Sequence, residues 1–248
     1  MRIIISPTKK MKIDDDVFSY DKLPFFIKEA NILKEELLKK NLEELKLLWK
    51  CSDKLLYENY NNLNNMDLYN KLGSAVLSYQ GLQFQYMAPS LFMETEFNYV
   101  RKHLRILSGM YGLLEPFDGI TSYRLEMQSK LEIDGIKNLY DFWGNKITDK
   151  LKSETDLIIN LASDEYSKVI KKDSDLKIVS IFFKEIKDNK LIEKGTLCKM
   201  ARGEMVRFMA ENNIIDIEGI KSFNRLNYEF NSEYSTNKEL IFIKKVRD

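Results

Sequence analysis

The apolar positions along this 248-residue chain recur with two different spacings. Between residues 24 and 60 they follow helical spacing, and Asn41 and Ser52 stand where helix N-caps are expected. This pattern predicts three amphipathic helices in that region. Apolar runs too short for helices predict strands instead, at residues 2–6, 74–87, 156–163, 177–187, 190–198, 226–231 and 239–245.

Further helical patterns separate these strands. They predict helices at residues 95–107, 139–152 and 201–212, and a short one that begins at Asp164. Asp188-Asn189-Lys190 is typical of a hairpin turn, so the strands on either side of it are expected to be antiparallel. Because no linker or repeat divides the chain, we expect a single domain over residues 1–248, of the α+β class, with a mixed sheet flanked by helices.

Composition narrows the class of protein. Hydrophobic residues make up 44% of the chain and charged residues 31%, which is typical of a globular protein, and the formal net charge is only +1. A protein that is basic all over its surface is therefore disfavoured, but a local basic patch is not. No apolar run reaches the roughly 20 residues that a membrane-spanning helix needs, and two cysteines without motif spacing fit a reducing cytoplasm.

Several short blocks, in their order along the chain, are more specific than these patterns. They are Ser6-Pro7-Thr8-Lys9, Ser52-Asp53-Lys54-Leu55, residues 103–112, Tyr123-Arg124-Leu125-Glu126-Met127, Phe142-Trp143-Gly144, residues 160–166 and Ala201-Arg202-Gly203. Together they closely resemble the YaaA family of bacterial peroxide-stress proteins. The resemblance implies a role in limiting iron-dependent oxidative damage under hydrogen peroxide. It also implies DNA binding through a helix-hairpin-helix element within one α+β domain, and it implies no settled reaction.

Three positions depart from the family pattern. Lys10 stands where the family usually has threonine, and Leu82 stands where it usually has an acid. The block that begins at Lys199 is one cation short. Any role of the missing acid is therefore not carried over to this chain.

The segment over residues 101–112 is the candidate DNA-binding element. Its glycines could free backbone N–H groups in a tight turn, and its cations could contact DNA phosphates without reading the bases. The candidate residues are Arg101, Lys102, Arg105, Ser108, Gly109, Met110, Tyr111 and Gly112. The alternative is a helix that ends at a left-handed Gly109 and is followed by a strand. If the hairpin exists, valine at both glycines should weaken DNA binding while the fold survives.

A second group of polar residues follows the predicted strands at residues 2–6 and 156–163. Since ligands often bind at the carboxyl ends of parallel strands, we expect a pocket there. The candidate pocket residues are Ser6, Lys9, Arg124, Glu126, Asn160, Ser163, Asp164, Tyr166, Lys199 and Arg202. In the alternative interpretation Ser163 is only an N-cap, Lys9 and Arg202 face solvent, and Arg124 and Glu126 form a structural ion pair.

Metal and nucleophile chemistry have little support in the sequence. His103 is the only histidine, and Cys51 and Cys198 lie far apart, so neither a metal site nor a Ser-His nucleophile is predicted. No cofactor is expected, the catalytic residues are left open, and an effect on iron would be indirect. His103 itself is most simply a packing residue.

The leading hypothesis is a cytoplasmic protein that binds duplex or structured DNA without sequence specificity. The alternative is an enzyme that acts on a nucleotide or nucleic-acid base in the pocket formed by the Ser6/Lys9 and Ser163/Asp164 loops. A scaffold with neither activity is a third possibility. The sequence does not determine the oligomeric state.

Overall fold

The computed structural model describes residues 1–13, 20–171 and 175–245. Its helices are α1 (Ile27–Leu38), α2 (Leu42–Trp49), α3 (Asp53–Asn64), α4 (Ala75–Ser78), α5 (Leu82–Met87), a 3-10 turn (Pro89–Leu91), α6 (Glu94–His103), α7 (Leu139–Trp143), α8 (Lys146–Lys152), α9 (Asp164–Ser167), α10 (Gly195–Glu211) and α11 (Ile217–Lys221). Its strands are β1 (Arg2–Ile5), β2 (Lys10–Met11), β3 (Gly73–Ser74), β4 (Tyr79–Gln80), β5 (Leu104–Ser108), β6 (Gly112–Leu114), β7 (Gly119–Ile120), β8 (Leu157–Asn160), β9 (Lys177–Lys187), β10 (Lys190–Ile192), β11 (Tyr228–Phe230) and β12 (Glu239–Lys244).

One mixed sheet runs through the described part of the molecule, with the strand order β11-β12-β9-β8-β1-β5-β6 and β10 paired to β9. The inner strands β12, β9, β8, β1 and β5 are parallel to their neighbours in that order. The outer strands β6, β10 and β11 pair in the antiparallel direction. The predicted α+β class with a mixed sheet is therefore confirmed.

Strand β1 lies in the middle of this sheet. Ile3 pairs with Leu104 of β5 on one side and with Ile159 of β8 on the other, and Ile3, Ile4 and Ile5 are completely buried. A strand that is covered on both faces has no polar positions, which explains why its sequence is a continuous apolar run. The amino-terminal residues thus form the centre of the core.

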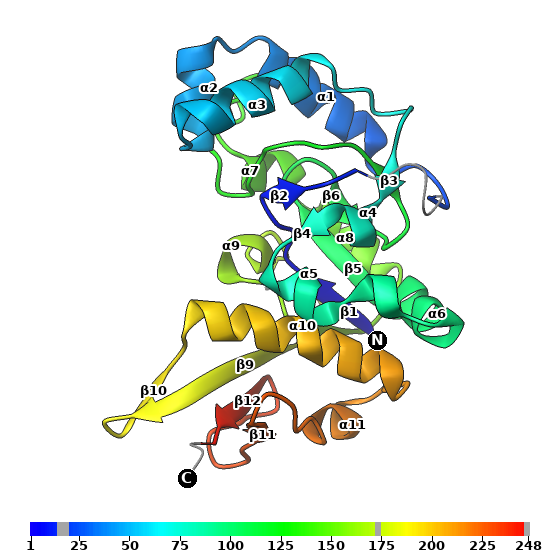
Figure 1. Cartoon of the computed structure of the whole chain (residues 1–248), viewed down its shortest axis with the longest axis vertical. Helices are drawn as coiled ribbons and strands as arrows, with labels where there is room; N and C mark the ends of the chain where they lie inside the picture. The colour runs from blue at the N-terminus through cyan, green and yellow to red at the C-terminus, as the bar shows by residue number, and fades with distance from the viewer. Residues whose placement is uncertain (14–19, 172–174, 246–248) are drawn as a thin grey trace.

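Helices surround the sheet in separate groups (Figure 1). Helices α1 to α3 lie together at one end of the molecule, and α10 packs along α5 and α6 and against β9. The three helices predicted between residues 24 and 60 are confirmed, and Asn41 forms a capping box with Glu44. Ser52 occupies the N-cap position of α3, but its side chain makes no capping hydrogen bond.

Other predicted boundaries are wrong. The segment predicted as a strand at 74–87 instead contains β3, α4, β4 and α5. The helix predicted at 139–152 is broken at Gly144, which ends α7 with a positive φ of 49°. The strand predicted at 190–198 stops at residue 192, because α10 already begins at Gly195. The Asp188-Asn189 hairpin turn is confirmed, with positive φ at both residues.

The helix-hairpin-helix prediction for residues 101–112 is also wrong. Helix α6 ends at His103, and the chain continues as the antiparallel hairpin β5–β6. The alternative with a left-handed Gly109 fails too, because the positive φ in this turn belongs to Gly112. A short apolar run has no period that distinguishes a helix from a strand that is buried on both faces, and the pairing of β5 with β1 decides for the strand.

This hairpin is buried, so it cannot present its backbone to DNA. Ser108, Met110 and Tyr111 are at most 1% exposed, and the Ser108 hydroxyl accepts hydrogen bonds from the N–H groups of Met110 and Tyr111. A Cβ atom on Gly112 would lie 2.7 Å from the Trp143 ring, at a φ of 67°. Valine at this position would therefore disturb the fold, contrary to the expectation that the fold survives.

Candidate functional site

The loops after β1 and β8 meet at the carboxyl edge of the sheet. The hydroxyl oxygens of Ser6 and Ser163 lie 3.1 Å apart, and the Ser163 N–H donates to Ser6 Oγ at 2.9 Å. The two strands are parallel neighbours, so their carboxyl ends lie side by side, as the sequence pattern predicts. Ser163 occupies the N-cap position of α9, but its side chain bonds to Ser6 and does not cap the helix.

A pocket of about 370 Å³ opens beside these serines, and we call it the β1–β8 pocket. Its walls come from five separate parts of the chain. They are Ser6, Pro7, Thr8, Lys9, Lys10, Gln80, Gly81, Leu82, Gln83, Glu126, Ser163, Glu165, Tyr166, Lys199 and Arg202. Seven of the ten candidate pocket residues thus line one cavity of the size that small ligands occupy.

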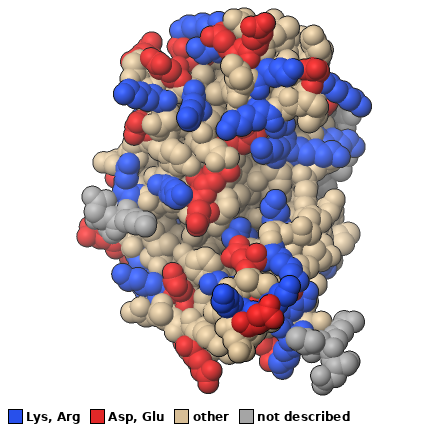
Figure 2. Space-filling model, turned by 90° about the vertical axis from the view of Figure 1, so that its left-hand side faces the viewer, with Lys and Arg blue, Asp and Glu red and all other residues tan. Residues whose placement is uncertain are grey.

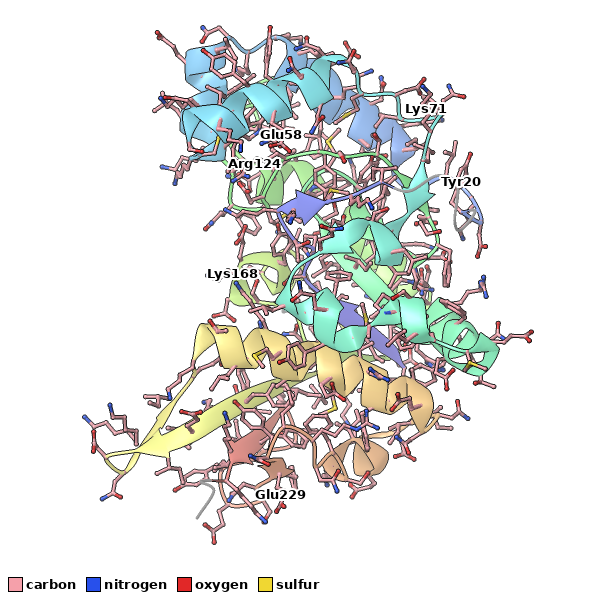
Figure 3. All side chains as sticks on the ribbon, in the orientation of Figure 1. Tyr20, Glu58, Lys71, Arg124, Lys168 and Glu229 are labelled. Carbon is pink, nitrogen blue, oxygen red and sulfur yellow. The ribbon has the colours of Figure 1, made fainter. Side chains whose placement is uncertain are left out.

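Charged side chains of both signs face this pocket. Lys9 Nζ lies 3.3 Å from Glu126 Oε1, and Arg124 Nη2 lies 3.6 Å from the same oxygen. The Lys9 side chain is 59% exposed, whereas the side chains of Arg124 and Glu126 are buried. Arg124 also donates to the Trp49 carbonyl, which fixes it beneath the end of α2 (Figure 3). Arg124 therefore makes the structural ion pair of the alternative interpretation, while Lys9 reaches solvent at the pocket.

The opposite wall is formed by α10 and α5. Arg202 lies 3.5 Å from Glu193, but its buried Nε has no hydrogen-bond partner among the described residues. Gln83 is buried, and its amide nitrogen Nε2 likewise lacks a partner in the described part of the chain. Lys199 is exposed one helical turn before Arg202. Buried donors without partners are costly, so this wall has unused capacity to bind an acceptor.

Burial raises the pKa of two groups that line the pocket, the Glu165 carboxyl and the Tyr166 hydroxyl. The nearby Glu126 carboxylate adds to the rise at Glu165. The Gln128 N–H, 3.4 Å from Glu165 Oε1, and Lys9 act in the opposite direction. This raised pKa lets Glu165 hold a proton nearer to neutral pH than an exposed glutamate does.

The other candidate pocket residues play supporting parts. Asn160 Oδ1 accepts the Ala162 N–H and its Nδ2 donates to Ser180, so it shapes the loop that carries Ser163. Asp164 is exposed and does not line the pocket. Together with Arg124, which borders a smaller neighbouring cavity, these residues lie around the pocket but outside it.

The residues predicted to bind DNA do not form one surface. Arg101 pairs with Asp21 at 2.9 Å and stacks over Phe117. Arg105 is buried and lies 2.7 Å from Glu154. Of the three cations in this segment, Lys102 alone is exposed and has no ion-pair partner in the described chain. Gly109 and its neighbours in the turn are buried, as described above.

Eight of the fifteen residues that line the pocket were not among the candidates from sequence, and they include the charged or buried polar residues Lys10, Gln83 and Glu165. Gln83 was not predicted because the segment 74–87 was expected to be a strand. Glu165 was not predicted because its neighbour Asp164 was expected to line the pocket instead. The glycine at position 81 is a signal that the sequence contains, because glycine is favoured where a turn is tight. In the structure its φ is 156°, and a Cβ there would lie 2.9 Å from Thr8. Only glycine lets this turn approach the loop that carries Lys9.

In the described ranges, no group of three or more His, Cys, Asp or Glu side chains is placed to hold a metal ion. His103 is buried against Tyr99 and lies 3.1 Å from the Met1 carbonyl. None of the helices in the same ranges is long and apolar enough to cross a membrane. The side chains that line the β1–β8 pocket offer ammonium and guanidinium cations, carboxyl groups, hydroxyls and amides. Such groups bind anions and transfer protons.

Comparisons with known proteins agree with the motif blocks. The family described as peroxide stress protein YaaA matches residues 1–234. A UPF0246 protein of Agathobacter rectalis is 50% identical over 99% of this chain and 100% of its own length. UPF0246 proteins of Desulfitobacterium hafniense and Lachnoclostridium phytofermentans are each 46% identical over 100% of this chain, and over 100% and 99% of their own lengths. The chain therefore belongs to the family of the peroxide stress protein YaaA.

Proposed function

We propose that this peroxide-stress family member binds the phosphate groups of a nucleotide in the β1–β8 pocket and acts on that nucleotide. The observation that carries the proposal is the convergence of Lys9, Lys10, Lys199 and Arg202 on one cavity at the carboxyl edge of parallel strands. Only Glu126 and Glu165 oppose these four cations among the pocket's lining residues. A ligand with several negative charges fits this balance.

The donors in the pocket suit phosphate oxygens. Arg202 offers a guanidinium whose Nε is unpartnered, and Lys9 and Lys199 offer ammonium groups on long flexible chains. Gln83 adds a buried amide donor. A neutral or cationic ligand would leave these donors unused.

Glu165 gives the pocket a group for proton transfer. Burial raises its pKa, so it can exchange a proton at a pH nearer to neutral than an exposed glutamate can. The Ser6 and Ser163 hydroxyls lie in the same pocket and can hold a reacting water or hydroxyl group. We propose that Glu165 donates or accepts a proton when the protein acts on the bound nucleotide.

DNA binding and the limitation of iron-dependent damage are implied by the family resemblance, and both stay predictions. The element expected to bind DNA is a buried β-hairpin, so this basis for DNA binding is lost. The geometry supports the nucleotide pocket better.

Isothermal titration calorimetry with a panel of nucleoside triphosphates tests the proposal. Lys199→Ala or Arg202→Ala should each lower the affinity more than tenfold, because each removes a charge-assisted hydrogen bond worth about 1.5–3 kcal/mol. Lys102→Ala is the matched control, since Lys102 is exposed on α6 and lies outside the pocket. Undetectable binding of every nucleotide, or unchanged affinity in both pocket variants, would contradict the proposal.

A further inference from the structure

A second hollow lies next to the β1–β8 pocket, between α2 and the segment 126–132. We call it the α2 hollow, and its volume is about 400 Å³. Lys9 and Glu126 line both cavities, so the two spaces meet at this ion pair. The α2 hollow lies on the side of the pocket that faces helices α1 to α3.

Apolar side chains form part of the α2 hollow. Leu47, Leu48 and Leu131 line it, and Leu47 is 77% exposed. A leucine this exposed contributes little to the core, but it gives a ligand an apolar surface to cover. This part of the hollow suits a flat or aliphatic group more than a phosphate.

Polar groups lie around this apolar surface. Ser129 is 5% exposed, and its hydroxyl has no hydrogen-bond partner among the described residues. Gln128, Glu44 and Glu132 also line the hollow and are exposed. Carboxylates and an amide can bind hydroxyl and amino groups, and a plain hydrocarbon chain would leave them unused.

The two cavities differ only slightly in net charge, and they differ more clearly in the three leucines that line the α2 hollow beside its polar groups. The α2 hollow has lysines at 9, 40, 50 and 130 and three glutamates, so it is closer to neutral than the pocket. Figure 2 shows that positive and negative side chains are interspersed in the half of the molecule that carries α1 to α3. The more strongly cationic space is the β1–β8 pocket.

We propose that the two cavities form one bipartite site for a nucleoside polyphosphate, with the base and ribose in the α2 hollow and the phosphates in the β1–β8 pocket. This inference rests on the proposed function and names its substrate class. A nucleoside combines apolar ring faces with polar edges and sugar hydroxyls, which is the mixture that the hollow offers. Phosphates alone would leave the apolar surface of Leu47, Leu48 and Leu131 uncovered.

Lys9 has a particular role in this arrangement. Its ammonium group stands at the junction, held by Glu126 at 3.3 Å and open to solvent. It is therefore placed to bind the phosphate that adjoins the ribose. Arg202 and Lys199 lie on the far wall of the pocket, where they would meet the distal phosphates.

The test compares the four ribonucleoside triphosphates with inorganic triphosphate by isothermal titration calorimetry. At least one nucleoside triphosphate should bind more than tenfold more tightly than inorganic triphosphate. Leu47→Asn and Ser129→Ala should each lower the affinity for that nucleotide several-fold and leave inorganic triphosphate binding unchanged. Leu55→Asn is the matched control, because Leu55 is an exposed leucine of α3 that lies outside the hollow.

The outcomes distinguish a failure of this inference alone from a failure of the proposed function. If inorganic triphosphate binds as tightly as every nucleotide and the hollow variants change nothing, the bipartite site is refuted while the phosphate pocket stands. If no triphosphate of either kind binds, both proposals fail. A 5′-phosphorylated dinucleotide that binds more tightly than any nucleoside triphosphate would also refute a single-nucleoside site, because the hollow would then hold part of a nucleic-acid strand.

Discussion

Asp118 places a carboxyl group in the core next to β7. It is 1% exposed, its Oδ2 accepts the Glu115 N–H at 2.8 Å, and its Oδ1 has no hydrogen-bond partner in the described chain. Burial raises the pKa of Asp118 from 3.8 to about 7, and the charge of Glu115 adds to the rise. The Glu115 N–H, Lys22 and Arg105 oppose it without cancelling it.

This raised pKa makes the free energy of unfolding depend on pH. Between pH 3.8 and about 7 the folded protein keeps a proton on Asp118 that the unfolded chain releases. Stability from this group is thus fully present below pH 3.8 and is lost as the pH rises to about 7. Because a tenfold change in proton affinity corresponds to about 1.36 kcal/mol, the loss is at most about 4 kcal/mol.

Asp118→Asn removes this dependence. The variant keeps an acceptor for the Glu115 N–H, and its amide adds a buried donor whose cost is the same at every pH. Urea unfolding of both proteins from about pH 4 to 8 measures their free energies of unfolding. The stability of the variant relative to the parent chain should increase up to about pH 7 and then stay constant. Asp149→Asn, at an exposed acid of α8, is the control. Parallel stability curves for the parent chain and Asp118→Asn would refute the reasoning.

Residues described above lead to three further predictions. Lys9→Ala should impair survival under hydrogen peroxide and lower nucleotide affinity more than tenfold, but it should hardly change the melting temperature, because the Lys9 ammonium is largely exposed and the buried Glu126 keeps Arg124 as its ion-pair partner. Normal survival, or a large drop in melting temperature, would contradict this role. After anaerobic incubation with Fe(II) and desalting, elemental analysis should find less than one iron per chain, since His103 is the only histidine. One tightly retained iron per chain would contradict it. Gly112→Val should lower the melting temperature strongly, because left-handed strain and the clash with Trp143 each cost about 1–3 kcal/mol. An unchanged melting temperature would contradict the described turn.

Long, periodic elements were predictable from sequence because one face of each is buried. The amphipathic helices before residue 60 illustrate this, whereas β8 has only four residues and was predictable as a continuous apolar run, as a central parallel strand requires. The short elements between 73 and 87 were not predictable, because each has only two to six residues and is fixed by distant partners. Residues 104–108 became a strand for the same reason, since β1 supplies their hydrogen bonds.

The candidate pocket was partly predictable for a topological reason. Parallel strands bring their carboxyl ends together, so Ser6 and Ser163 could be paired without knowledge of the rest of the sheet. No comparable rule places Gln83 or the α2 hollow, which depend on how α5 and α2 pack against loops far away in sequence. The family blocks identified Glu126 and Arg202 as residues of interest, but they did not show that both line one cavity.

The central position of β1 has a consequence for how the chain folds. Its residues are synthesised before both of their partners, because they pair with β5 about 100 residues later and with β8 more than 150 residues later. Closing such long loops costs entropy before any contact compensates for it, so the sheet cannot assemble around its first strand early. Until β8 has left the ribosome, Ile3, Ile4 and Ile5 lack one of their two neighbours and remain an exposed apolar strand edge. Until then β1 should be prone to aggregate, and the pocket at its carboxyl end should form only after β8 has paired with it.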